Sequence, residues 1–170
     1  MATGALGPLA LLWLAIRSVA WAVLLPGVVA GYVPWRLFEL ARSPVSWHDP
    51  LDVLGVASLL PGIGLLTACI WKSALRGRGT PSPVDPPTQL VVQGLYRHVR
   101  NPMYLSVIAI LLGEILITRS VGLFTYGAVW FAAVNLFVIG YEEPTLRRQF
   151  GASYHRYAAA VGRWIPRAGR

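Results

Sequence analysis

The sequence predicts an all-α polytopic membrane protein with about four transmembrane helices and a C-terminal amphipathic cytoplasmic helix. Only 13% of its 170 residues are charged and 55% are hydrophobic, whereas about 25% of the residues of a typical soluble domain are charged. Long apolar stretches alternate with short basic clusters, and the mean hydropathy is +0.55. This alternation is typical of a multi-pass membrane protein.

The first two predicted spans form an N-terminal unit, residues 1–75. The first span covers residues 6–33 and contains Arg17 and Pro26. It lacks the basic region of a cleaved signal peptide and its apolar stretch is too long for one, so we expect it to be retained. The second span covers residues 51–75, where the sequence LLPGIG places a proline and a glycine that predict a kink.

The second unit, residues 76–170, contains a loop rich in proline and glycine, the other two predicted spans and the tail. Residues 103–118 are apolar, but these sixteen positions fall short of the roughly 20 that cross a hydrocarbon core. Residues 121–140 form the fourth span, and only the sequence TRS separates it from the third. We therefore expect a tight antiparallel helical hairpin.

The tail after the sequence YEEP has the pattern of an amphipathic helix. Apolar residues recur there at spacings of three and four: Leu146, Phe150, Tyr154, Tyr157, Val161 and Trp164. Pro144 suits a first helical turn, the glutamates before it suit a helix N-terminus, and Gly151 weakens the helix locally. We expect this helix to fold back onto the cytoplasmic face of the membrane.

The basic residues predict the orientation and the partners. Four spans place the loop before the third span and the tail on one side, which holds eleven of the fifteen arginines and lysines. The positive-inside rule makes that side cytoplasmic. The net charge of +8 lies beside apolar segments, so it indicates anionic membrane lipids and excludes nucleic acid.

Metal and disulfide chemistry have no support in the sequence. Cys69 is the one cysteine, so the chain forms no internal disulfide. The three histidines are far apart and follow no spacing that is typical of metal ligands. We expect no metal.

Two polar clusters stand out against this apolar background. GLYRHVRNPMYLS precedes the third span and YEEP follows the fourth, so the hairpin brings them to the same depth at the cytoplasmic side. Aromatic rings, amide and guanidinium donors and two carboxylates suit a ligand with an adenine ring, ribose hydroxyls and separate positive and negative groups. The alternative is that the arginines and tyrosines anchor the span at the interface and the glutamates serve a helix N-terminus. Adjacent carboxylates repel each other and are repelled by anionic lipid, so their presence at this depth favours a ligand-binding role.

These same residues resemble a known superfamily. GLYRHVRNPMYLS, followed by EEPTLRRQFGASYHRYAAAVGRWIP, is similar to the isoprenylcysteine carboxyl methyltransferase and phospholipid methyltransferase superfamily, whose members are membrane-embedded and use S-adenosylmethionine. The resemblance covers residues 88–166, and the first two spans add nothing to it. It implies a methyltransferase that passes the methyl group of S-adenosylmethionine to a lipophilic acceptor, which enters from the bilayer.

The resemblance and the polar clusters together predict the cofactor site. The expected residues are Leu90, Val91, Gly94, Tyr96, Arg97, Arg100, Asn101, Pro102, Met103, Tyr104, Glu142 and Glu143. The tyrosines would hold the adenine or contact the sulfonium by cation–π attraction. Either glutamate would accept hydrogen bonds from ribose hydroxyls or pair with the ammonium group, and Arg97 or Arg100 would bind the carboxylate.

The chain departs from the superfamily pattern at two positions. Asn101 stands where the superfamily has a histidine before Pro-x-Tyr, so this side chain positions the site and does not titrate. Val138 stands where the isoprenylcysteine enzymes have an arginine, which weighs against a prenylcysteine carboxylate as acceptor. No residue is assigned as catalytic.

Two other functions remain open at this point. One is an NADPH-dependent membrane reductase of related architecture, and the other is a small four-helix transporter with Glu114 as its coupling carboxylate. Glu114 is the one carboxylate of the third span and is a functional candidate for that reason. We favour the simpler interpretation that it lies near the far interface and pairs with Arg17 or Arg119.

Overall fold

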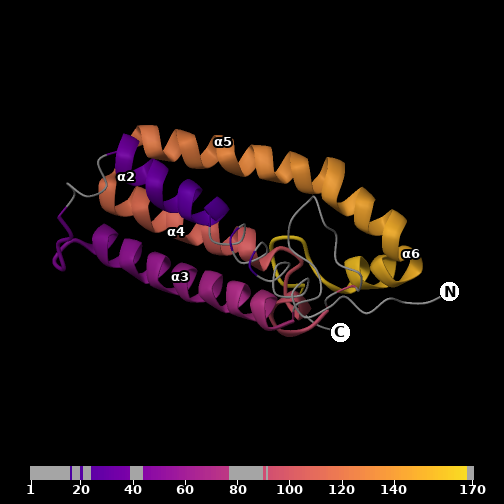
Figure 1. The fold of residues 1–170 in the computed structure, drawn as a ribbon. Coiled ribbons are helices and arrows are strands. Elements are labelled where there is room, and N and C mark those ends of the chain that lie inside the picture. Colours follow the sequence, from indigo (N-terminus) through magenta and orange to yellow (C-terminus); the bar gives the residue numbers. More distant parts are fainter. Residues whose placement is uncertain are drawn as a thin grey trace.

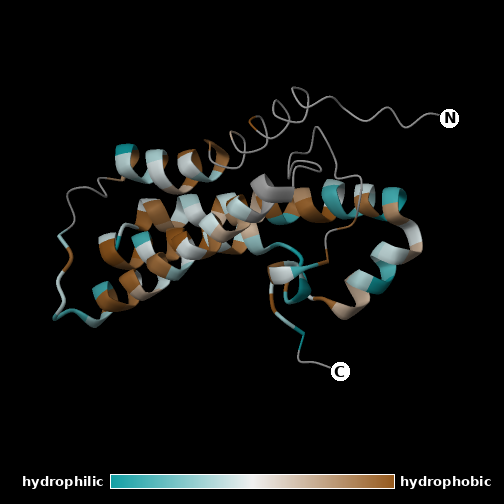
Figure 2. Ribbon diagram, turned by 60° about the horizontal axis from the view of Figure 1, so that its bottom comes forward, coloured by the Kyte–Doolittle hydropathy of each residue, from teal (hydrophilic) through white to brown (hydrophobic). Residues whose placement is uncertain are grey.

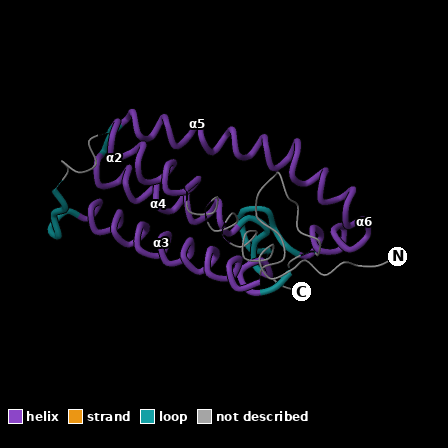
Figure 3. The backbone as a smooth tube through the Cα atoms, in the orientation of Figure 1, coloured by secondary structure: helices purple, strands orange, loops and turns teal. Residues whose placement is uncertain are grey.

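The computed structural model describes residues 16, 20, 24–38, 44–76, 90 and 92–167. In these residues all regular secondary structure is helical, as the sequence predicts, and no strand forms (Figures 1 and 3). Two helices are long and apolar enough to cross a membrane, Pro50–Trp71 and Val121–Ala160, and Pro102–Thr118 is a shorter apolar helix. Figure 2 shows hydrophobic residues along much of these helices and more polar residues in the part of the last helix that follows α5 (Val121–Phe137).

The described end of the first predicted span is a helix that runs through a π-turn, η1 (Val28–Tyr32), into α2 (Val33–Leu37). Ala30 leaves helical geometry inside the π-turn, with φ −110° and ψ 20°. The hydroxyl of Tyr126 donates to the carbonyl oxygen of Val29 at 3.0 Å. Most of the predicted span, with Arg17, lies outside the described residues.

The second predicted span is α3, Pro50–Arg76, which matches its expected bounds. The helix continues without interruption through Pro61, so the kink expected there does not break it. Gly62 has a different role, because a Cβ atom at this position would lie 2.9 Å from Cγ1 of Ile110 on the next helix, α4 (Pro102–Thr118). The missing side chain lets the two helices approach closely.

Glycines at two further positions bring α3 against α4 (Pro102–Thr118). A Cβ atom on Gly113 would lie 2.6 Å from the carbonyl oxygen of Gly55, and one on Gly55 would lie 2.9 Å from the carbonyl oxygen of Gly113. The hydroxyl of Ser58 donates to the carbonyl oxygen of Ala109 at 2.8 Å. Small residues and a side-chain hydrogen bond are the usual means by which membrane helices pack.

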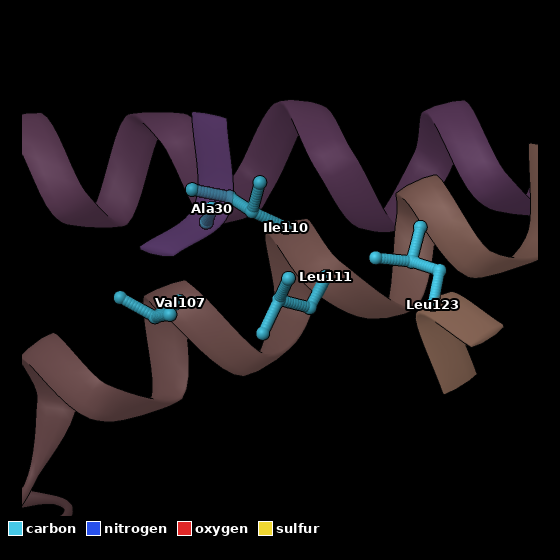
Figure 4. Packing of buried hydrophobic residues seen from close by; sticks show 5 residues of the cluster. All are labelled: Ala30, Val107, Ile110, Leu111 and Leu123. Carbon is cyan, nitrogen blue, oxygen red and sulfur yellow. The ribbon is translucent and has the colours of Figure 1, made fainter. Parts of the chain in front are cut away.

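The predicted hairpin is present. The backbone of Arg119 takes the left-handed conformation (φ 52°) after α4, and the Ser120 hydroxyl accepts from the N–H of Leu123 to begin α5, Val121–Phe137. The guanidinium of Arg119 also bonds Asp49 at 2.5 Å and Asp52 at 2.9 Å, which ties the hairpin turn to the start of α3. Figure 4 shows the core between the first helix and the hairpin, where Ala30, Val107, Ile110, Leu111 and Leu123 are buried.

The fourth predicted span and the tail as far as Phe150 form one continuous helix, where the sequence predicted two. The chain runs from α5 through a π-turn, η4 (Val138–Glu142), into α6, Glu143–Ala160. The backbone N–H of Glu143 bonds the carbonyl oxygen of Val138, five residues back. This wider turn lets the helix continue past Pro144, whose ring clashes with the preceding turn of a regular α-helix. The π-turn in front of Pro34 is built in the same way.

The tail turns at Gly151, which has φ 49° and ψ −126° inside α6. Residues with a side chain rarely adopt such angles, so the predicted weak point is a break in the helix. Tyr154, Tyr157 and Val161 then pack with Leu90 and other apolar residues into a second buried cluster. The predicted apolar face therefore contacts the loop that precedes α4. Val161 and Trp164 lie beyond the helix, which ends at Ala160.

Candidate functional site

The polar loop before α4 is held by its backbone. Gly94 has φ 64° at the start of a short 3₁₀ helix, η3 (Gly94–Arg97). Asn101 lies at the N-cap of α4 and Pro102 occupies its first position, where the missing N–H of a proline costs no hydrogen bond. This geometry turns the chain from the loop into α4 and places Tyr104 in the first helical turn.

Tyr96, Tyr104 and Glu142 come together at this end of the hairpin. The hydroxyl of Tyr104 donates to Oε2 of Glu142 at 3.4 Å. Burial raises the pKa of the Tyr96 hydroxyl, and the carboxylate of Glu142 raises it further. The two polar clusters therefore meet at one depth, as the hairpin predicts, and Glu142 is their meeting point.

Glu143 points into a cluster of arginines. Its side chain is 5% exposed, and both of its oxygens bond the guanidinium of Arg163, at 2.6 and 2.9 Å. Arg100 lies 3.0 Å from the same carboxylate and Arg147 lies 3.5 Å away. The two neighbouring glutamates thus have different surroundings. Among the described residues, Glu142 makes no ion pair.

The arginine cluster fastens residues 161–164, which we call the C-terminal strap, to the loop. The backbone N–H of Arg100 donates to the carbonyl oxygen of Gly162 at 2.9 Å, and Val99 pairs with Gly162 as an isolated parallel bridge. The side-chain amide of Asn101 donates to the carbonyl oxygen of Arg163 at 3.3 Å. Asn101 is buried, so it holds the strap with a group that neither gains nor loses a proton.

The remaining predicted residues surround this arrangement. The carbonyl oxygen of Tyr96 accepts from the Tyr157 hydroxyl at 2.7 Å, which joins the loop to α6. Leu90 packs on the tyrosines of α6, Met103 is half-buried, and Arg97 is exposed. Val91 lies outside the described residues.

Trp164 was not predicted as a site residue. Its ring lies edge-on to Tyr104 and to Phe131, with centroid distances of 6.3 and 5.5 Å. Its indole N–H donates to Oδ1 of Asn135 at 3.0 Å. Asn135 lies in the last turn of α5, so this hydrogen bond joins α5 to the strap. Arg163, which bonds Glu143, was not predicted as a site residue either.

Glu114 lies apart from this site. It is 3% exposed, and its Oε2 atom is buried with no hydrogen-bond partner in the described part of the chain. The expected pair with Arg119 is wrong, since that guanidinium bonds Asp49 and Asp52. Ten residues of α4 separate Glu114 from Tyr104, which corresponds to about 15 Å along the helix.

These features define the class of protein: it is helical and membrane-associated, with a polar site at one end of a helical hairpin. The family model described as phospholipid methyltransferase matches residues 51–153, which is more than half of the chain. The chain therefore belongs to the phospholipid methyltransferase family and is a membrane methyltransferase. No curated protein and no solved structure matches it.

Proposed function

We propose that this protein is an integral membrane enzyme that transfers the methyl group of S-adenosylmethionine to a lipophilic acceptor supplied by the bilayer. The observation that carries the proposal is the position of Glu142. Its carboxylate meets Tyr104 and lies near Tyr96 at the end of the hairpin, and it makes no ion pair with the described arginines.

The residues present fit the cofactor by their chemistry. Glu142 is available to accept hydrogen bonds from ribose hydroxyls or from an ammonium group. The rings of Tyr96 and Tyr104 suit an adenine or a sulfonium. Arg97 is exposed and makes no ion pair among the described residues, whereas Arg100 is bound to Glu143. We therefore assign the carboxylate of the cofactor to Arg97.

The protein contributes mainly alignment and the exclusion of water. When bound, S-adenosylmethionine would supply a methyl group on a sulfonium: the nucleophile of the acceptor would bond the methyl carbon from the side opposite the sulfur, and the sulfur would leave as the neutral thioether of S-adenosylhomocysteine. Asn101 carries no titratable proton and its amide is bonded to Arg163. The carboxylate beside Tyr104 is Glu142, and this proposal assigns it to the cofactor. The acceptor then enters as a nucleophile: a thiolate, a carboxylate or a deprotonated amine.

The proposed topology has several membrane spans, with the site on the cytoplasmic face, where the cofactor is made. Its basis is the excess of arginine in the loop and the tail. Apolar residues along α5 are exposed, Val129 and Leu136 among them. These surfaces suit contact with lipid, so the acceptor reaches the site laterally while the cofactor enters from the cytoplasm.

The two other functions receive less support. A reductase that binds NADPH needs basic groups for its phosphates, and Arg100, Arg147 and Arg163 are all engaged by Glu143. A transporter is favoured by one observation, the buried Glu114 without a partner among the described residues. That carboxylate lies far from the site around Glu142, and a transport role for it does not explain why the C-terminal strap is fastened to the loop before α4.

The proposal is tested by calorimetry on the purified full-length protein with S-adenosylmethionine and, separately, with NADPH. Binding of S-adenosylmethionine that weakens in the Glu142→Gln variant supports the assignment. Binding of NADPH alone would replace it with a reductase. Binding of neither ligand by a folded protein would refute the proposed site.

A further inference from the structure

The C-terminal strap places one large side chain between the two helices of the hairpin. Tyr104 lies in the first turn of α4 and Asn135 in the last turn of α5, and Trp164 contacts both. Its ring also lies edge-on to Phe131, one helical turn before Asn135. Trp164 therefore joins α4 to α5 at the depth of the Glu142 site.

The strap is built to hold this side chain in one position. Its backbone bonds Arg100 and Asn101 of the loop, and the side chain of Arg163 makes two hydrogen bonds to Glu143. Gly162 opens a tight turn, since a Cβ atom there would lie 1.9 Å from the carbonyl oxygen of Ile165. A side chain at this position is excluded by backbone, so Gly162 permits the turn that presents Trp164.

Trp164 has neighbours of two kinds. One is Tyr104, whose hydroxyl bonds Glu142. The other is α5, where Phe131 is exposed, and the next residue of the chain, Ile165, is exposed as well. The indole ring thus contacts both a proposed cofactor residue and a helix with exposed apolar side chains, from which a lipid would come. A ring with an apolar body and one N–H donor suits such a boundary.

We propose that Trp164 is the wall of the acceptor site, where it positions the reacting head group of a lipid and sets which acceptors are accepted. This inference rests on the proposed function and goes beyond it. Asn135 acts through Trp164, because its amide oxygen fixes the rotation of the indole ring. Glu143 and Arg163 act through the strap.

The kinetic test uses the full-length protein in vesicles of phosphatidylethanolamine and phosphatidylglycerol at saturating S-adenosylmethionine. The mole fraction of phosphatidylethanolamine is varied, and cofactor affinity is measured separately by calorimetry. We expect Trp164→Ala to raise the KM for the lipid roughly tenfold or more, as for other aromatic contacts at the centre of a binding surface. Cofactor affinity should change less than threefold.

Conservative and control variants separate positioning from folding. Trp164→Phe keeps a ring and should recover most of the KM, while Asn135→Ala should raise it in the same direction by a smaller factor. Trp47→Ala removes an exposed tryptophan outside the site and should change neither constant. An unchanged lipid KM in a folded Trp164→Ala protein would overturn the proposal, and so would an equal loss of cofactor affinity.

A second measurement does not depend on turnover. In a variant that keeps Trp164 and has phenylalanine at every other tryptophan, fluorescence should be quenched by phospholipid brominated on its acyl chains. If the wild-type protein methylates no lipid but this quenching occurs, the proposed function fails and the lipid-facing wall stands. Absence of quenching in a variant that still binds S-adenosylmethionine would refute the wall whatever the activity.

Discussion

Replacing each of the two adjacent glutamates by glutamine should change a different quantity: cofactor affinity for Glu142 and stability for Glu143. Glu142→Gln removes a charge from a residue that bonds Tyr104 and makes no ion pair among the described residues. A hydrogen bond to a charged group contributes roughly 1.5–3 kcal/mol. At 1.4 kcal/mol for each factor of ten, affinity for S-adenosylmethionine should fall about 10- to 150-fold. The free energy of unfolding should hardly change.

Glu143→Gln should instead destabilise the fold. Glutamine keeps one acceptor oxygen, but it leaves the guanidinium of Arg100, whose side chain is 10% exposed, without its counter-charge. Breaking a buried ion pair costs roughly 3–5 kcal/mol. Arg163 and Arg147 are 29% and 51% exposed, and solvent screens their part of the interaction. We therefore expect a loss of about 2–3 kcal/mol in unfolding free energy.

Calorimetry with S-adenosylmethionine and thermal unfolding in the same detergent measure both quantities for both variants. We expect cofactor affinity to fall in Glu142→Gln with stability retained, and stability to fall in Glu143→Gln. Equal effects of the two substitutions on affinity, with stability unchanged in both, would show that the glutamates act as one cofactor-binding pair.

Four further predictions concern the rest of the fold. Gly113→Ala should lower the free energy of unfolding by about 3 kcal/mol or more, because its Cβ atom would lie 2.6 Å from the backbone of Gly55. Gly64→Ala has open space around it and should be tolerated, and equal unfolding temperatures of the two variants would refute the close helix packing. Glu114→Gln should keep turnover and should not lower stability, because it removes a buried carboxylate that lacks a partner among the described residues; a hundredfold fall in turnover would identify a general base. The N–H of Leu51 and the guanidinium of Arg119 hold the pKa of Asp49 below its usual value of 3.8. Ionised Asp49 therefore adds stability that is complete above pH 3.8 and is lost as the pH falls through its lowered pKa, and Asp49→Asn should remove that part of the acid dependence in a pH titration of unfolding. In a protein whose one cysteine, Cys69, is replaced by alanine, a cysteine at His48 should react with an impermeant label outside intact cells and one at His98 should not, and the reverse pattern would invert the proposed topology.

Local sequence signals predicted the elements whose formation depends on local rules. Apolar length predicted α3 and α4 to within a residue or two, and the short TRS connection predicted the hairpin turn. The hairpin in turn implied that Tyr104 and Glu142 meet, because two antiparallel helices joined by a tight turn have their other ends at the same depth.

The remaining features depend on contacts that periodicity does not contain. Pro144 and the glutamates before it look like a helix start, and only the π-turn at Val138–Glu142 shows how a helix passes through them. Trp164 fits the apolar spacing of the tail, but a glycine two residues earlier ends that pattern and the strap leaves the helix. Gly55 and Gly113 appear as isolated glycines until α3 and α4 are placed side by side.

The different roles of Glu142 and Glu143 also depend on a contact between residues that are distant in sequence. Glu142 and Glu143 are equivalent in sequence, and the difference arises because Arg163, twenty residues away, reaches back to Glu143. No spacing rule links these positions, since the chain turns at Gly151 between them. The fold selects which carboxylate remains available to a ligand.

The most direct test of the proposed activity is the fate of a labelled methyl group. The full-length protein in phospholipid vesicles is incubated with S-adenosylmethionine that carries a deuterated methyl, and the extracted lipids are examined by mass spectrometry. We predict a lipid species heavier by one deuterated methyl group, formed by the wild-type protein and greatly reduced in Glu142→Gln at limiting cofactor. A folded protein that binds S-adenosylmethionine yet labels no lipid, in vesicles or in native membrane extracts, would contradict methyl transfer to a bilayer acceptor.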